Sequence, residues 1–364
     1  MNKINELIKQ GAPEFFERKS IIFHVEYPSI CNQHCSYCLE GNFSDDRIIN
    51  QPWETDKILK AIDKIFDAYD DSYALGFIIA GGEPTIQPSF LKLIEKLKSR
   101  KNTYQVVTTN FTQSEEFYRT LDIPLVTSLH LDFHEPQKWL EKTIALKDLI
   151  LETRIMAHPQ KMDKVKEAYN LFMQAKDKYK LSFSVEKIDA FTIKGKDDKL
   201  ISYNPEYNIA DKKWVQSHLT ERQPYSEILS EKAGVLKSMF YSAVWYYKNG
   251  DKKTLQTEER NFKNWFCERN IVVIKSDGTL FFGWYCDTNT GYNIFKDDFF
   301  PKDKLKTVVC QNSVCPLSFG ASSPKYKDIS HAPKYTSKVK LLILKLDSKT
   351  KNLQRLYKLL KLIG

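Results

Sequence analysis

Short apolar segments alternate with amphipathic helical segments through the first half of this chain. The apolar segments are predicted strands, at residues 21–27, 75–80, 104–108, 125–133, 152–157 and 181–188. Between them, residues 55–69 place Ile58, Ile62 and Ile65 on one helical face, and residues 89–98 are a second predicted helix. Strands separated by helices of this length form parallel crossover units, so the sequence predicts an α/β fold.

Three of the seven cysteines lie in one short segment, C-N-Q-H-C-S-Y-C, at Cys31, Cys35 and Cys38. Three thiolates at this spacing can bind three irons of a four-iron cluster and leave the fourth iron open. Closely spaced cysteines also hold structural zinc, but zinc needs a fourth ligand. His34 lies beside Cys35 and is more easily solvated than folded back onto the same metal. The segment therefore favours an iron-sulfur cluster.

The remaining cysteines form a second group near the end of the chain, at Cys267, Cys286, Cys310 and Cys315. Four thiolates can ligate every corner of a cluster, which suits electron transfer or a structural role. Long gaps between ligands are weakly diagnostic, so zinc or unliganded buried thiols are alternatives for this group.

The first cysteine segment carries Tyr37 as its aromatic residue and is followed by Gly81-Gly82-Glu83-Pro84. These two motifs, in this order, resemble the radical S-adenosylmethionine (SAM) superfamily. The resemblance implies a four-iron four-sulfur cluster on the three cysteines, whose free iron binds the amino and carboxylate groups of SAM. Electron transfer then cleaves SAM to methionine and a 5′-deoxyadenosyl radical, which removes a hydrogen atom from the substrate. The resemblance also places the glycine-glycine-glutamate turn, with Pro84, beside the methionine amino group. Two glycines let backbone approach a ligand closely, and a carboxylate accepts from an ammonium.

The same resemblance implies that the crossover units form a partial (β/α)6 barrel with its site at the carboxyl ends of the strands. Side chains alternate between the two faces of a strand, so in residues 128–134 the polar set should face the lumen. The predicted lumen residues are His24, Glu26, His130, Asp132, Arg154 and Glu186. Each is alternatively a satisfied polar group of the core or of a strand end. His130, Glu26 and Glu186 are the candidate catalytic bases.

Further cofactor contacts follow from the family pattern. Thr109 and Asn110 come after the third strand and resemble the segment beside the methionine or ribose of the cofactor. Ser128 and Asp132 are expected at the ribose, and Arg154 at the carboxylate of the cofactor. An ordinary turn residue or a solvated arginine is the alternative at these positions.

Four parts are predicted along the chain: a radical SAM partial barrel at 1–195, an aromatic-rich helical connector at 196–263 with a helix at 226–248, an auxiliary-cluster domain at 264–323, and a basic amphipathic tail at 324–364. The third part is expected to be a small α+β domain resembling the twitch or SPASM-like domain of radical SAM enzymes. Its residues 271–274 and 280–282 flank a Ser276-Asp277-Gly278 turn and predict a hairpin. The hairpin would bring Cys267 and Cys286 together, and Cys310 and Cys315 would complete an auxiliary four-iron cluster.

The charge distribution and the hydropathy of the chain limit which partners it can bind. The net charge of +9 is concentrated after residue 333, where nine Lys and Arg face a single acid, Asp347. The body is near neutral, which argues against a nucleic-acid enzyme with a broad basic groove. The tail has an apolar helical stripe, Leu353, Leu356, Leu360 and Ile363, and is expected either to lie on the inner membrane surface or to pack on the barrel. With no apolar run of roughly 18 residues, the chain is expected to be cytoplasmic.

We therefore expect a radical SAM oxidoreductase that abstracts hydrogen from a polar substrate, a sugar or aminosugar, with help from the auxiliary cluster. A flavodoxin or ferredoxin is the expected electron donor. One alternative is an enzyme that modifies a ribosomal peptide, although the C-terminal cysteine group has no dense C-x-x-C run. The other is a zinc or iron-sulfur scaffold without catalysis at the membrane surface.

Overall fold

A computed structural model describes residues 20–38, 51–71, 73–188, 191–194, 200–219, 244–246, 252–254, 263–283, 291–302, 307–310 and 325–326. The central sheet has eight strands in the order β13-β12-β1-β2-β3-β4-β5-β6. They are β1 Ser20–Tyr27, β2 Ala74–Gly81, β3 Thr103–Thr109, β4 Leu125–Leu129, β5 Ile150–Ala157, β6 Phe183–Lys187, β12 Ile271–Ile274 and β13 Leu280–Phe282. Strands β1 to β6 are parallel neighbours in chain order.

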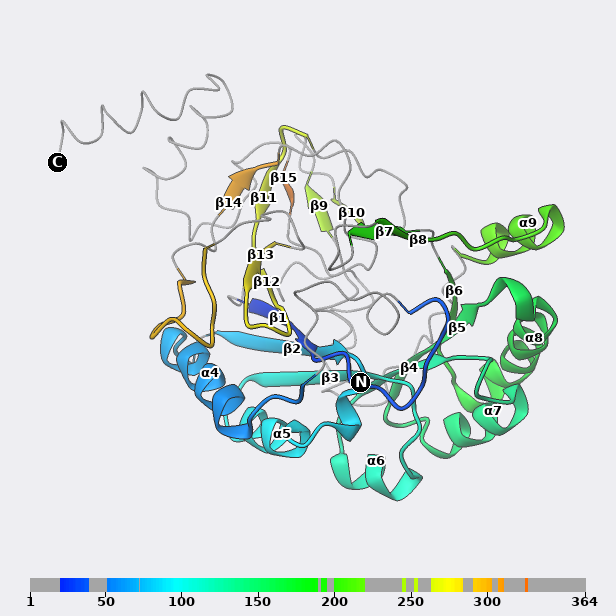
Figure 1. Ribbon diagram of the computed structural model, residues 1–364, viewed down its shortest axis with the longest axis horizontal. Helices are drawn as coiled ribbons and strands as arrows, with labels where there is room; N and C mark the ends of the chain where they lie inside the picture. The colour runs from blue at the N-terminus through cyan, green and yellow to red at the C-terminus, as the bar shows by residue number, and fades with distance from the viewer. Residues whose placement is uncertain are drawn as a thin grey trace.

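Helices connect these strands and lie in an arc along the outer side of the sheet (Figure 1). They are α4 Thr55–Ala68, α5 Phe90–Lys98, α6 Glu115–Leu121, α7 Pro136–Ala145 and α8 Met162–Tyr179, with short 3-10 turns at η1 Pro84–Ile86 and η2 Pro159–Lys161. The predicted α/β fold with a partial (β/α)6 barrel is confirmed. Topology of this kind gathers the carboxyl ends of β1 to β6 at one end of the barrel.

The core lies between the sheet and the helices. Phe23 of β1 stacks on Phe77 of β2 with ring centroids 5.0 Å apart. The predicted helical face of α4 is buried through Ile58, Ile62 and Ile65. Removing each such side chain from water stabilises the fold by about 1.5–3 kcal/mol. The periodicity that predicted the helices is therefore the same feature that attaches them to the sheet.

Strand β4 is shorter than predicted. It ends at Leu129, and the backbone N–H of Phe133 donates to the carbonyl of His130 at 3.1 Å, which closes a turn. Phe133 is 45% exposed, although Leu131 is buried. The predicted strand over 125–133 is wrong after Leu129, because apolar alternation persists in the sequence while the backbone turns. His130 and Asp132 consequently lie on the loop between β4 and α7.

The predicted hairpin at 271–282 is confirmed, and it belongs to the barrel sheet. Strands β12 and β13 are antiparallel, and Gly278 in their turn has φ +88°. On its other side β12 runs parallel to β1, with Val273 opposite His24. The side chain of Trp53 holds the turn, since its Nε1 donates to the carbonyl of Ser276 at 2.6 Å. The part predicted to begin at residue 264 thus shares a sheet with the barrel.

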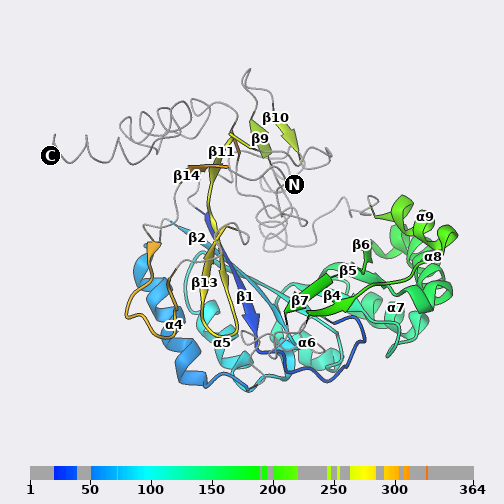
Figure 2. The ribbon, with the colours of Figure 1, turned by 45° about the horizontal axis from the view of Figure 1, so that its top comes forward.

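Two smaller sheets complete the described strands. One has the order β10-β9-β15-β11-β14, from β9 Val244–Tyr246, β10 Lys252–Thr254, β11 Phe266–Glu268, β14 Thr307–Val309 and β15 Lys325–Tyr326. Figure 2 shows this sheet to one side of the barrel. The other pairs β7 Phe191–Lys194 with β8 Leu200–Tyr203, across the predicted boundary at residue 195.

The predicted helix over 226–248 is wrong at residues 244–246, and its other positions lie outside the described residues. Strand β9 occupies these three positions and pairs with β10 and β15. Valine, tryptophan and tyrosine favour strands, and pairing with distant strands outweighs a helical pattern. The connector is therefore not wholly helical.

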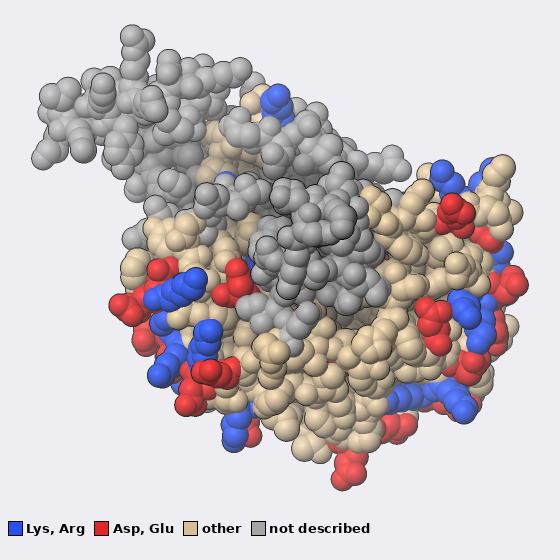
Figure 3. Space-filling model, in the orientation of Figure 1, with Lys and Arg blue, Asp and Glu red and all other residues tan. Residues whose placement is uncertain are grey.

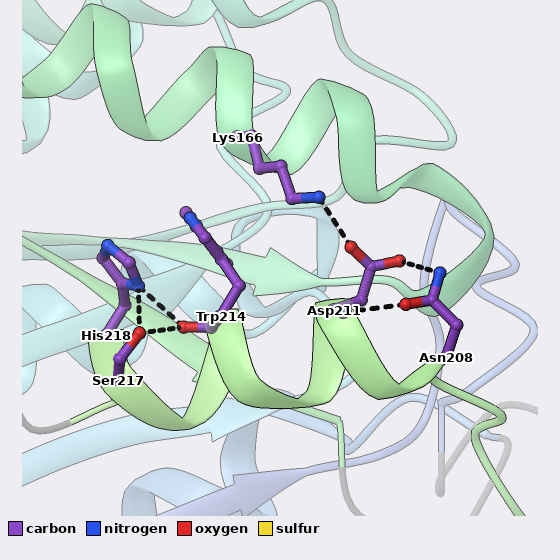
Figure 4. Close-up of polar contacts among 6 residues, drawn as sticks. All are labelled: Lys166, Asn208, Asp211, Trp214, Ser217 and His218. Atoms are coloured by element: carbon purple, nitrogen blue, oxygen red, sulfur yellow. Dashed lines mark hydrogen bonds and ion pairs between the residues drawn. The ribbon is translucent and has the colours of Figure 1, made fainter.

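Helix α9, Ile209–His218, packs against α8 (Figure 4). Asn208 caps its first turn, and Lys166 of α8 donates to the Asp211 carboxylate at 2.6 Å. Before it, the Tyr207 hydroxyl donates to the carbonyl of Ala157 and accepts from the backbone N–H of Ile188. These contacts attach the start of the connector to the ends of β5 and β6.

Positive and negative side chains are interspersed over the helices on the face shown in Figure 3. This mixture agrees with the near-neutral body read from the sequence. Among the helices of the described residues, none is long and apolar enough to cross a bilayer. Apart from residues 325–326, the predicted basic tail lies outside the described residues, so its membrane contact stays a prediction.

Candidate active site

The cysteine loop directly follows β1, at the carboxyl end of the barrel strands. Cys35 is buried, and Cys31 and Cys38 are partly exposed. The backbone N–H of Cys38 donates to the carbonyl of Cys35 at 3.0 Å. Burial, followed by the neighbouring Cys38 and Cys31 thiolates, raises the pKa of Cys35 to about 12. Three thiols this close resist ionisation together, and binding a cationic metal cluster is what removes that cost.

No three Cys, His, Asp or Glu side chains in the described ranges already have the arrangement of a metal site. The donor set nevertheless fits a four-iron cluster, because three thiols share one loop and affect one another's ionisation. His34 is exposed, as predicted, and does not fold back onto this group. The loop therefore offers three sulfur ligands to a cluster, and His34 does not supply a fourth.

Gly81 and Gly82 let the end of β2 pack against the chain that enters the cysteine loop. Gly81 has φ +116°, and a Cβ there would lie 2.4 Å from the carbonyl oxygen of Tyr27. A Cβ on Gly82 would lie 2.4 Å from the carbonyl oxygen of Ile30. Both glycines were predicted to admit a ligand, but the atoms that they admit here belong to the chain itself. They position the loop, and their contact with SAM stays a prediction.

Glu83 joins the ends of β2 and β3. Its side chain is buried, and Oε1 accepts from the hydroxyls of Thr85 at 2.6 Å and Thr109 at 2.8 Å. Oε2 accepts from the backbone N–H of Asn110 at 2.6 Å. Burial raises the pKa of this carboxyl, and the hydrogen bonds act in the opposite direction. Thr109 and Asn110 thus contact the glutamate of the motif, and their contact with the cofactor stays a prediction. Pro84 begins the 3-10 turn that follows.

Residues after β4 bind the cysteine loop from the other side. The Tyr37 hydroxyl lies 2.8 Å from Nδ1 of His130, and Nε2 of Gln33 lies 2.6 Å from Nε2 of His134. Burial lowers the pKa of His130 to about 4 and raises that of Tyr37, so at neutral pH the phenol donates to a neutral imidazole. His130 therefore contacts the cysteine loop through Tyr37, and its predicted place in the lumen as a catalytic base stays a prediction.

His158 was missed in the sequence. It directly follows β5 and lies under the cysteine loop, with Nε2 3.4 Å from the Ser36 hydroxyl and 3.4 Å from Oδ2 of Asp132. The backbone N–H of Gln160 donates to Nδ1, so the neutral ring carries its proton on Nε2, toward Asp132. Its place at the carboxyl end of a barrel strand was the available signal. Asp132 is thus brought to His158, and its predicted contact with ribose is untested.

The lumen near β1 contains an ion pair that crosses to the hairpin. Lys275, which follows β12, donates to Oε2 of Glu26, and Nδ1 of His24 lies 3.6 Å from Oε1 of the same carboxylate. Burial is the main cause that lowers the pKa of His24, with smaller lowering by Lys275 and Arg154. His24 and Glu26 were predicted here. Lys275 was missed, because it was assigned to a separate domain.

The opposite wall of the lumen is formed by β4 to β6. Ser128, Arg154 and Ser184 lie in one register row across these strands. Nε of Arg154 lies 3.5 Å from Oε2 of Glu152, and the Ser184 hydroxyl donates to Glu186 at 3.2 Å. Ser128, Arg154 and Glu186 were predicted on this wall, and Glu152 was missed.

Of the second cysteine group, Cys267 and Cys310 lie within the described residues. Cys267 is on β11, opposite Val308 of β14. Cys310 follows β14, and its backbone exchanges hydrogen bonds with Trp265 and Asn264. The two cysteines therefore lie on adjacent antiparallel segments. Cys286 and Cys315 lie outside the described residues, so the auxiliary cluster stays a prediction.

Residues 25–148 match the family model described as the Radical SAM superfamily. This segment, about a third of the chain, is similar to the radical SAM domain. The matched residues include the cysteine loop, the glycine-glycine-glutamate turn and the Asn110 turn, which the structure brings together. At the level of this segment, the match supports the predicted radical SAM enzyme with SAM and a four-iron cluster as cofactors.

Solved structures similar to this chain include anSMEcpe with bound AdoMet, at 17% identity and a TM-score of 0.48, covering 77% of this chain and 76% of that one. Streptococcus suis SuiB bound to precursor peptide SuiA has 15% identity and a TM-score of 0.46, covering 80% and 66%. BtrN in complex with AdoMet and 2-DOIA has 15% identity and a TM-score of 0.30, covering 60% and 85%. No curated protein matches the chain.

Proposed function

We propose that this chain cleaves SAM reductively and uses the resulting radical to abstract hydrogen from a small substrate rich in hydroxyl or amino groups, such as a sugar or aminosugar. The observation that carries the proposal is the polar lumen beside the cysteine loop. Glu26 and Lys275 lie on one wall, and Arg154 and Glu186 lie on the other. They lie on or directly after strands of the sheet whose first strand leads into the cysteine motif.

Cys31, Cys35 and Cys38 would hold the cluster, which supplies the electron that cleaves the sulfonium of SAM. Glu83 holds Thr109 and Asn110 at the same strand ends. Its Oε2 accepts from the backbone N–H of Asn110, and a carboxylate oxygen can accept from a second donor such as an ammonium. Tyr37, held by His130, adds an apolar ring to this region. Cys35 and Tyr37 are buried, and shielding of this part of the loop from water would protect a radical from side reactions.

The lumen suits a substrate with hydroxyl groups because it presents donors and acceptors in adjacent pairs. Lys275 is paired with Glu26, and Arg154 with Glu152. A hydroxyl both donates and accepts, so one such pair can satisfy it fully. The lowered pKa of His24 keeps this ring neutral at pH 7. Glu26 and Glu186 are the carboxylates placed to accept a proton from the substrate, whereas His130 is engaged with Tyr37.

An oxidation would require a second electron to leave the substrate radical. We propose that an auxiliary cluster, to which Cys267 and Cys310 contribute, accepts this electron. Their adjacent segments support this proposal. The reducing electron for SAM would come from a small donor protein such as flavodoxin or ferredoxin. We expect the chain to work in the cytoplasm, in line with reduced thiols.

The experiment is deuterium transfer from candidate substrates. Reconstituted enzyme is reduced without oxygen in the presence of SAM and a perdeuterated sugar or aminosugar, and 5′-deoxyadenosine is analysed by mass spectrometry. Deuterium in this product is expected with a true substrate and should be lost in Lys275→Met, while unlabelled 5′-deoxyadenosine still forms. Deuterium transfer only from a labelled peptide would overturn the proposed substrate class in favour of peptide modification. Zinc without sulfide in the purified protein would favour the scaffold.

A further inference from the structure

Asn110 joins the end of β3 to the cysteine loop through its side-chain amide. Its Nδ2 lies 3.6 Å from the sulfur of Cys31 and donates to Oδ1 of Asn32 at 2.8 Å. The Asn32 amide donates to the Thr112 hydroxyl at 2.9 Å, and this hydroxyl donates to Oδ1 of Asn110 at 2.8 Å. Three side chains thus form a closed ring of hydrogen bonds.

The ring and the sulfur together determine which way the amide points. Exchanging the nitrogen and oxygen of Asn110 alone would set two acceptors against each other at Asn32. Reversing both amides and the Thr112 hydroxyl would keep the ring, but it would set the Asn110 oxygen against the Cys31 sulfur, so Nδ2 lies on the side of the sulfur. The same sulfur also receives the backbone N–H of Gln33 at 3.4 Å. The sulfur of Cys31 thus has two N–H groups beside it, one from the side chain of Asn110 and one from the backbone of Gln33.

A strained turn at Phe111, directly after Asn110, helps to position the Asn110 side chain. Phe111 is buried and has φ +60°, a left-handed conformation that costs a bulky residue about 1–3 kcal/mol. Its ring packs on Tyr118 and Trp139 with centroids 4.9 and 5.2 Å away. Lys142 of α7 donates to the carbonyl of Phe111 at 2.7 Å and lies 4.4 Å from the ring centroid. Strain retained this way is typical of functional positions.

We propose that Asn110 is a positioning residue of the cluster, donating N–H to the Cys31 sulfur and thereby raising the reduction potential of the cluster. Hydrogen bonds to cluster sulfurs stabilise the more negative, reduced state. This role rests on the cluster assigned to the cysteine loop. The proposed role differs from the contact with SAM that the sequence predicted for Asn110, because here the Asn110 amide donates to the sulfur of a metal ligand.

The test is the midpoint potential of the reconstituted holoenzyme, followed by electron paramagnetic resonance in a redox titration. Asn110→Leu keeps the backbone N–H that binds Glu83 and removes the side-chain amide, both the donor to the sulfur and the acceptor from Thr112. We expect a lower potential, with the oxidised-to-reduced ratio at a fixed potential changed tenfold, or about 59 mV for one electron. The matched control is Gln33→Leu. It removes the side-chain amide that contacts His134 and keeps the backbone N–H that donates to the Cys31 sulfur. Its potential should match the wild type.

A second readout is pulsed paramagnetic resonance after exchange into heavy water. One exchangeable deuteron coupled to the reduced cluster should disappear in Asn110→Leu and persist in Gln33→Leu. If Asn110→Leu fails to hold its cluster, Asn110→Asp and Thr112→Val replace it. The first removes the N–H at constant size, and the second frees the amide from its ring. Both should lower the potential.

Unchanged potential and couplings in these variants would overturn the role of Asn110, as would equal shifts in Gln33→Leu. Loss of the four-iron signal in the wild type would instead overturn the cluster assignment itself. The two failures are therefore distinguishable.

Discussion

Lys275 and Glu26 form an ion pair between the β12–β13 hairpin and the first strand of the barrel. The two residues lie near opposite ends of the described sequence, yet β12 pairs directly with β1. The pair puts an ammonium group of the C-terminal half into the lumen of the N-terminal barrel. Closure of the lumen on this side thus depends on residues outside the matched radical SAM segment.

Lys275→Met should lower the free energy of unfolding by about 1–3 kcal/mol, because it leaves a mostly buried Glu26 carboxylate without its cation. Lys275→Arg should retain most of the stability, since it keeps the charge. Denaturant unfolding of both variants measures the difference. A methionine variant as stable as the wild type would show that the pair contributes nothing.

Gly81→Ala should reduce the iron bound by the protein, because a Cβ would collide with the backbone of Tyr27 and displace the cysteine loop. Gly291→Ala is the matched control. Gly291 also has positive φ, at +70°, but a Cβ there meets nothing within 4 Å. Iron and sulfide content after anaerobic reconstitution is the measurement. Equal losses in the two variants would assign the effect to backbone strain alone.

His130 should make the protein less stable as the pH falls. The folded protein lowers the pKa of His130 to about 4, whereas the unfolded value is about 6.5. Below pH 6.5 the unfolded chain therefore binds a proton that the folded protein does not, and stability is lost progressively down to about pH 4. Above pH 6.5 this contribution is constant.

The comparison of wild type with His130→Asn isolates this effect, because other acidic groups titrate equally in both. Urea unfolding at pH 7 and pH 5 should show a smaller difference in the variant. Direct titration of the His130 ring by nuclear magnetic resonance should give an apparent pKa near 4. A ring that titrates near 6.5 would contradict its burial against Tyr37.

Local sequence patterns predicted much of the barrel. Ile58, Ile62 and Ile65 lie on the buried face of α4, and the cysteine loop and Glu83 meet at the ends of β1 and β2. These features depend on periodicity or on a motif of adjacent residues. These features can therefore be predicted from the local sequence.

Other features depend on contacts between distant segments, which periodicity does not encode. The end of β4 at Leu129 is set by a turn that holds His130 against Tyr37, while the sequence continues to alternate. The pairing of Ile22 with Ile271 assigns the hairpin to the barrel, and no pattern in either strand specifies that partner. His158 and Lys275 were missed for this reason.

The central claim is that the Cys31, Cys35 and Cys38 loop holds a cluster with one open iron that cleaves SAM. The most direct measurement is formation of 5′-deoxyadenosine from SAM by the anaerobically reduced, reconstituted protein. We predict the product in the wild type, its abolition in Cys35→Ala, and largely intact cleavage without coupled turnover in Cys310→Ala. A wild type with its full four-iron content that forms no 5′-deoxyadenosine, or equal loss in both variants, would contradict the account.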